Sequence, residues 1–223
     1  MNFADMWQTW IKATTSPNDA TFEELRRKSD ANVTTAIIWM AFYGAVSAVA
    51  GVISGLMFAG AMSTTVPAIL EQANLPPAEA AQIEPILNTL TGGGAMGAAG
   101  LASLANIITV PLFFLISVGI YFLIARVLGG SGDFGRYAYL NAAFAAPLGI
   151  LTTLLGMVPF VGCITPLISL YSLVLVYFAT KTEHQMSSGR AIWVVLLPVL
   201  VAIGLMMCLI LGVFGLVASL QNQ

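Results

Sequence analysis

Five long runs of hydrophobic residues alternate with six polar pieces along this chain. Each run is close to the ~20 apolar residues that a helix needs to cross the ~30 Å hydrocarbon core of a bilayer. The pattern predicts an all-α, polytopic membrane protein with five transmembrane helices. We expect the spans at about 37–62, 101–125, 137–157, 161–180 and 191–217.

The boundary between the third and fourth spans is the shortest. Only five residues, from Val158 to Gly162, join the two runs. A four-span alternative would merge them into one helix of more than forty residues that contains Pro159. A proline inside a helix removes a backbone hydrogen bond and clashes with the preceding turn. The sequence therefore favours a tight helical hairpin.

The basic residues are distributed on one side of this pattern. The first, third and fifth polar pieces hold all eight of them: Lys12, Arg26, Arg27, Lys28, Arg126, Arg136, Lys181 and Arg190. Cytoplasmic flanks of membrane spans are enriched in Lys and Arg. We therefore predict a multi-pass protein of the cell membrane with a cytoplasmic N-terminus and an outer C-terminus. Four spans would place Lys181 and Arg190 outside, so the charge pattern also favours five.

These boundaries divide the chain into a cytoplasmic leader (1–36), a membrane domain (37–217) and a short outer tail (218–223). The leader begins with an apolar stripe at helical spacing, formed by Phe3, Met6, Trp7, Trp10 and Ile11. Trp7 and Trp10 suit the headgroup region, where an amphipathic ring keeps one edge wet. The alternative is a cap that packs on the helical bundle. A second helix is expected to start with Ser16 as N-cap and Pro17 at its first position.

The outer loop, residues 63–100, is the one sizeable extramembrane region on that side. Pro77 can open a helix that runs through Leu90. This helix would lie on the outer surface or plug the bundle.

Composition excludes several classes of protein. The chain is 58% hydrophobic and 8% charged, whereas soluble domains are about 25% charged. A nucleic-acid-binding protein would need a basic surface, so no nucleic-acid partner is expected. Cys163 and Cys208 both lie in apolar runs, where buried thiols behave as small hydrophobes.

The five spans, as bounded above, contain no Asp, Glu, Lys, Arg or His. Ionisable residues inside spans usually mark ion paths or proton relays, so proton coupling is not expected. Asn106 and Asn141 are the amide side chains within the spans. They either hydrogen-bond between helices or line a conduit. Gly51 and Gly55 form a GxxxG step, which serves internal packing or a homo-oligomer.

Candidate chemistry is confined to the cytoplasmic loops. The string from Gly130 to Asp133 matches the GxGD motif of intramembrane aspartyl proteases. Those enzymes need this Asp and a second one inside spans, where the two share a proton. Asp133 lies in a loop, so the string is better interpreted as a turn. Asp133, Arg136, His184 and Arg190 come from adjacent inner loops and form the candidate set of cytoplasmic contacts. We predict no enzyme activity, no metal site and no cofactor.

Several motifs together resemble the Yip domain family, named for Ypt/Rab-GTPase-interacting proteins. They are the Ser16-Pro17-Asn18-Asp19-Ala20-Thr21-Phe22 start, the Gly129-to-Arg136 loop, Ala146-Pro147, the Pro159-to-Gly162 hairpin and the His184-to-Ala191 loop. Their order and the five-span layout carry the resemblance, which covers most of the chain. It implies a five-helix membrane domain with a cytoplasmic N-terminus.

Eukaryotic members of that family are linked to vesicle traffic and to Rab-type GTPases. This chain lacks their long N-terminal region and their Asp-Leu-Tyr-Gly-Pro string, and it is similar to the short prokaryotic type. The resemblance supplies no activity and no functional residue for that type. We therefore expect a non-enzymatic protein that organises membranes or binds membrane lipids, a membrane-protein partner or a second copy of itself. The alternative is a conduit for lipid or a neutral solute.

Overall fold

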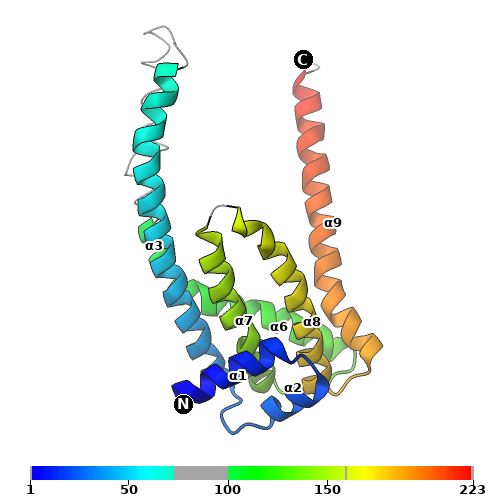
Figure 1. Cartoon of the computed structure of the whole chain (residues 1–223). Coiled ribbons are helices and arrows are strands. Elements are labelled where there is room, and N and C mark those ends of the chain that lie inside the picture. The colour runs from blue at the N-terminus through cyan, green and yellow to red at the C-terminus, as the bar shows by residue number, and fades with distance from the viewer. Residues whose placement is uncertain (1, 73–99, 159, 222–223) are drawn as a thin grey trace. The chain divides into compact units, whose positions relative to one another are not determined.

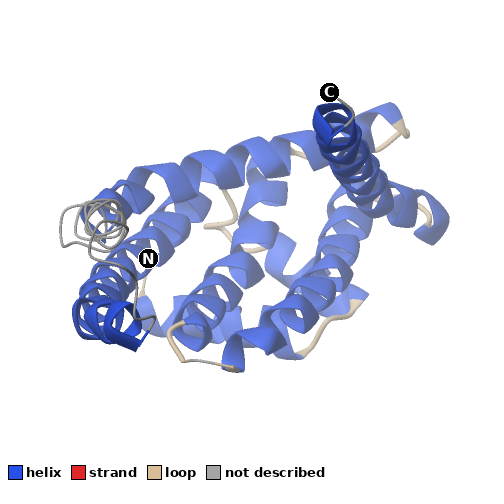
Figure 2. Ribbon diagram, turned by 90° about the horizontal axis from the view of Figure 1, so that it is seen from above, coloured by secondary structure: helices blue, strands red, loops and turns tan. Residues whose placement is uncertain are grey.

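The structure, a computed structural model, describes residues 2–72, 100–158 and 160–221. In that part of the chain every regular element is helical (Figure 2). The elements are α1 (Phe3–Thr15), α2 (Asp19–Arg26), α3 (Val33–Gln72), η1 (Ser103–Ala105), α6 (Asn106–Val127), α7 (Phe134–Gly156), η2 (Val161–Ile164), α8 (Thr165–His184) and α9 (Ser188–Gln221). Five helices are long and apolar enough to cross a bilayer. The predicted all-α, five-span membrane fold is confirmed.

The helices run further than the apolar runs that predicted them. α3 continues to Gln72, α8 to His184 and α9 to Gln221. Side chains become polar where a span leaves the hydrocarbon, but the helical backbone hydrogen bonds can continue beyond that point. Charged residues assigned to loops therefore lie in terminal helical turns, as Arg126 does at the end of α6. The helix expected from Pro77 to Leu90 lies outside the described residues.

The third and fourth spans are separate helices. α7 ends at Gly156, and the short η2 begins at Val161 ahead of α8. Phe160, with φ 69°, adopts the left-handed conformation between them. The chain thus reverses at the site predicted for the hairpin. Cys163 and Cys208 are free thiols exposed on the protein surface. Each lies on a side of its helix that the bundle does not cover.

The chain forms two compact units. The first unit comprises residues 1–36, 116–144 and 170–223, and the second comprises residues 37–115 and 145–169. All eight basic residues belong to the first unit.

In the second unit, small residues bring α3 close to the start of α6. A Cβ added to Gly51 would lie 2.5 Å from Ser103 Cβ, and one on Gly44 would meet the Asn106 backbone carbonyl. Ser103 Oγ donates to the Ala48 carbonyl at 2.9 Å. The GxxxG face of α3 therefore serves internal packing in this unit.

In the first unit, α1 has one set of side chains that is buried against the protein and a second, apolar set that is exposed. Met6, Thr9, Trp10 and Ala13 are buried, whereas Phe3, Trp7 and Ile11 are 67%, 53% and 46% exposed. These three lie four residues apart and form a single row beside the buried face of the helix. The predicted apolar stripe is thus divided between a packed face and an exposed face.

The helix α2 starts later than predicted. Its N-cap is Asn18, whose side chain accepts from the Thr21 N–H, and not Ser16. The Asn18 carboxamide reaches the third helical N–H, as an N-cap side chain does. Phe22 then packs on the rings of Phe144 and Phe178, at 6.4 and 6.1 Å between centroids. Figure 1 draws α1 and α2 (blue) beside the end of α8 that leads into α9.

Candidate functional site

The candidate site is built around the α6–α7 loop, residues 129–133. Gly129 adopts φ +89°. Its N–H donates to the Arg126 carbonyl at 3.0 Å, and the Gly130 N–H donates to the Ala125 carbonyl at 2.8 Å. This is a Schellman cap, in which a left-handed glycine ends the helix. The predicted turn at this glycine-rich string thus terminates α6 and redirects the chain.

The loop then lies directly on the last turn of α8. A Cβ on Gly130 would lie 2.6 Å from His184 Nδ1, and one on Gly132 would lie 2.9 Å from Glu183 Cγ. The Ser131 N–H donates to the His184 carbonyl at 3.4 Å. Glycine is required at positions 130 and 132 because the backbone approaches α8 too closely for a side chain.

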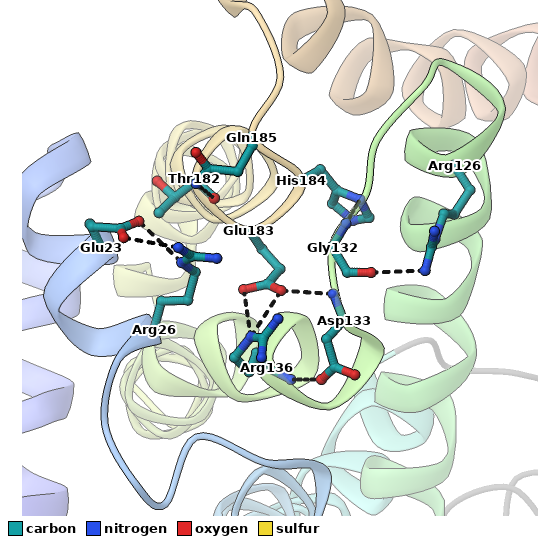
Figure 3. Close-up of polar contacts among 10 residues, drawn as sticks. All are labelled: Glu23, Arg26, Arg126, Gly132, Asp133, Arg136, Thr182, Glu183, His184 and Gln185. Atoms are coloured by element: carbon teal, nitrogen blue, oxygen red, sulfur yellow. Dashed lines mark hydrogen bonds and ion pairs between the residues drawn. The ribbon is translucent and has the colours of Figure 1, made fainter.

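Glu183 is the centre of this contact. Its side chain is 0% exposed. One carboxylate oxygen accepts from the Asp133 N–H at 2.7 Å and from Arg136 Nε at 3.1 Å (Figure 3). Asp133 caps α7, because its side chain accepts from the Arg136 N–H at 3.0 Å. A buried carboxylate with a charged partner and a backbone donor fixes the loop, α7 and α8 together.

His184 acts as a hydrogen-bond acceptor. Its Nδ1 accepts from the Gly132 N–H at 3.2 Å, which requires that this nitrogen be unprotonated. The ring lies 5.1 Å from both the Phe122 and Tyr137 rings. Arg126 donates to the Gly132 carbonyl at 3.0 Å. His184 is thus a buried structural side chain at the loop contact.

The end of α2 adds a second charged group. Arg26 forms a two-pronged pair with Glu23, at 3.1 and 2.9 Å, and Arg27 reaches the same carboxylate at 3.0 Å. The hydrogen bond from Arg26 lowers the pKa of Glu23; burial opposes this shift, and Arg27 adds to it. Glu23 raises the pKa of Arg26 in return.

Three of the four residues predicted as cytoplasmic contacts take part in the hydrogen bonds around the loop and Glu183. Asp133, Arg136 and His184 all contact the loop or Glu183. Arg190 is exposed, and its guanidinium lies beside Gly129. Sequence reasoning missed Glu183. Glu183 had one available signal, as the acidic residue beside the single histidine.

The two predicted amides make contacts inside the protein. Asn106 Nδ2 donates to Ser47 Oγ of α3 at 3.2 Å, within the second unit. Asn141, in the first unit, is buried and donates to the Tyr137 carbonyl one turn earlier, at 2.8 Å. The Asn106 bond joins two helices, whereas the Asn141 bond stays within α7.

The two tryptophans of α1 differ. Trp10 is 1% exposed and belongs to the core of the first unit, whereas Trp7 is 53% exposed. Only Trp7 has the exposed ring that an interfacial anchor requires. Within residues 2–72, 100–158 and 160–221, no group of three or more His, Cys, Asp or Glu side chains is placed to hold a metal ion.

Of three comparisons with known proteins, one found a match. A search of curated proteins found no match, and neither did a search of solved structures. The family model of the Yip1 domain matches residues 11–210. Because this match runs from α1 into α9, the chain belongs to the Yip1 domain family.

Proposed function

We propose that this integral membrane protein is non-enzymatic and acts by binding a membrane-protein partner or a second copy of itself through its polar cap. The polar cap is defined as α1, α2, the 129–133 loop, the first turn of α7 and the last turn of α8. The proposal assigns the protein to the cell membrane, with the polar cap on the cytoplasmic side.

This proposal rests mainly on one observation: charged and titratable side chains of the cap bind other groups of the protein. Asp133 caps a helix, Arg136 neutralises buried Glu183, and His184 accepts a backbone N–H. A catalytic group must reach a substrate and exchange a proton with it. These three side chains instead stiffen the cap, and a rigid surface loses less entropy when a partner binds.

The outer surface of the cap has features of a binding surface. Lys12 pairs with Glu24, and Lys181 pairs with Asp19; side chains of these pairs are up to 59% exposed. Exposed pairs contribute little to stability. Complementary charge can, however, guide association with a partner.

Contacts among the polar pieces support the proposed topology. Lys181 pairs with Asp19 of the leader, and Glu183 pairs with Arg136 in the first turn of α7. The first, third and fifth polar pieces therefore meet at one end of the first unit. This arrangement supports an N-terminus on the Lys- and Arg-rich side.

The exposed row of α1 supports an interfacial role for this helix. Phe3, Trp7 and Ile11 would enter the headgroup region while the neighbouring buried face packs on the first unit. Trp7 is the proposed anchor. Trp10 holds α1 to the protein from the buried side.

The conduit is the weaker proposal. Asn106 and Asn141 would have to face a path for lipid or solute, but both side chains hydrogen-bond within the protein. Lipid scrambling by reconstituted protein, lost on Asn106→Leu, would favour the conduit over the scaffold.

The test is chemical crosslinking in native membranes followed by purification of the full-length protein. We expect a partner in fixed stoichiometry or a defined oligomer. The variant Glu24→Lys reverses one exposed cap charge and should weaken that complex at least severalfold. Leu209→Ala, on the exposed face of α9, is the matched control. A monomer without partners, or equal recovery with both variants, would contradict the proposal.

A further inference from the structure

A basic cavity lies at the end of the first unit and is lined in part by residues of the polar cap. It has a volume of about 540 Å³ and is lined by Arg26, Arg27, Lys28, Ala31, Asp133 and Arg136. Four cationic side chains thus face one carboxylate. That carboxylate, Asp133, already accepts the backbone N–H of Arg136.

The acidic partners of these cations do not line the cavity. Glu23 pairs with Arg26 and Arg27, Asp5 with Lys28, and Glu183 with Arg136. None of these three carboxylates is among the lining residues. The cavity surface is therefore cationic, although the surrounding charge is balanced.

The cations retain hydrogen-bond donors for a ligand. Arg136 donates to Glu183 through Nε, which leaves the two terminal nitrogens of its guanidinium. Lys28 Nζ donates to Asp5 and Thr9, so one of its three hydrogens is left. Arginine forks and lysine ammonium groups are the side chains that proteins use for phosphate.

Two helix N-termini meet beside the cavity. A Cβ on Gly135, in the first turn of α7, would lie 3.4 Å from the backbone nitrogen of Val33, where α3 begins. Each N-terminus contributes partial positive charge. Both helices are candidate spans, with first residues Val33 and Phe134. The cavity therefore lies where lipid headgroups are found.

We propose that this cavity binds the phosphate group of an anionic lipid headgroup. A lipid is favoured over a soluble phosphate because α3 and α7 enter the bilayer within a few residues of the lining cations. The site does not depend on the proposed protein partner. The proposed site also does not depend on the orientation of the chain, because its cations lie at the ends of two spans in either case.

Native mass spectrometry of the full chain in an uncharged detergent tests the site. The protein is offered equal amounts of phosphatidylglycerol and phosphatidylcholine with the same acyl chains. We expect preferential binding of phosphatidylglycerol. Arg27→Gln should weaken that binding about fivefold, as expected from roughly 1 kcal/mol per basic residue near an anionic surface. Arg27 is suitable because it is exposed and Glu23 keeps Arg26 as a partner.

Arg136→Lys is the second variant. It keeps a cation for Glu183 but removes the guanidinium fork, so it should also weaken phosphatidylglycerol binding. Arg190→Gln removes an exposed cation outside the cavity; it is the control and should leave the preference unchanged. Equal binding of the two lipids, or a preference that neither cavity variant reduces, would overturn the proposal. Displacement of phosphatidylglycerol by millimolar inorganic phosphate would overturn the lipid assignment.

Discussion

At the residue scale, Glu183 shows how a charged group is accommodated at the end of a membrane helix. Its carboxylate is buried, but it has a backbone donor from Asp133 and a cationic partner in Arg136. Removing one member of such a pair leaves an uncompensated charge, which costs more than the pair itself contributes. The contribution of Arg136 to stability can therefore be measured as its coupling free energy with Glu183.

A double-mutant cycle tests this coupling. Arg136→Gln should lower the free energy of unfolding by about 2 kcal/mol, because a buried carboxylate loses its charged partner. Adding Glu183→Gln should recover more than half of that loss. Arg190→Gln, which removes an exposed cation, should stay within about 0.5 kcal/mol. The measurement is thermal unfolding in detergent, and additive effects of the two substitutions would contradict the coupling.

Glu23 provides a pH-dependent test. Hydrogen bonding from Arg26 lowers its pKa in the folded protein below its ordinary value of 4.5. A carboxylate of this kind stabilises the fold above the unfolded pKa, and that contribution is lost as pH falls through the folded value. Unfolding temperature should therefore drop below about pH 4.5. Glu23→Gln should show a smaller drop than the parent protein. Parallel pH profiles for the two proteins would refute this assignment.

At the scale of elements, glycines set the distances between helices and loops. Gly130 and Gly132 allow the α6–α7 loop to lie on the end of α8, and Gly44 and Gly51 allow α3 to approach residues 103–107. In each case an added Cβ would meet backbone or constrained side-chain atoms. The GxxxG step predicted close packing at Gly51 without showing which segment it faces, whereas Gly130 and Gly132 were predicted only as parts of a turn.

The loop contact is tested by Gly130→Ala. The new methyl group would meet His184 Nδ1 at 2.6 Å and the Ala125 carbonyl at 2.9 Å, so the loop or α8 must move. We expect a loss of about 1–3 kcal/mol in the free energy of unfolding. Gly189→Ala in α9 is the control, since its added Cβ has open space and alanine favours helix. Equal stability of the two variants would show that the loop does not lie on α8.

The packing of α3 is tested by Gly44→Ala. The added Cβ would overlap the Asn106 carbonyl, so we expect a loss of about 1–3 kcal/mol. Gly60→Ala lies in the same helix, and its added Cβ finds nothing within 4 Å. That control should be neutral or slightly stabilising in thermal unfolding. A Gly44→Ala protein as stable as the control would refute the close contact.

At the scale of the whole molecule, hydropathy predicted the five helices because burial in lipid requires long apolar runs. It predicted their ends poorly, since Lys181 to His184 continue α8 although their side chains are polar. The loop residues Asp133, Arg136 and His184 were predicted as a group from adjacency of the loops. Glu183 was missed because its burial depends on a tertiary contact that spacing along the chain does not reveal.

Our main proposal is that the polar cap of this five-span protein faces the cytoplasm. Its most direct test is labelling of single cysteines in intact cells with a membrane-impermeant maleimide, after Cys163 and Cys208 are replaced by alanine. We predict that Gln82→Cys and Asn222→Cys are labelled from outside, whereas Asn2→Cys and Gly189→Cys are labelled only after permeabilisation. Labelling of Asn2→Cys and Asn222→Cys from the same side, or the inverse pattern, would contradict this account.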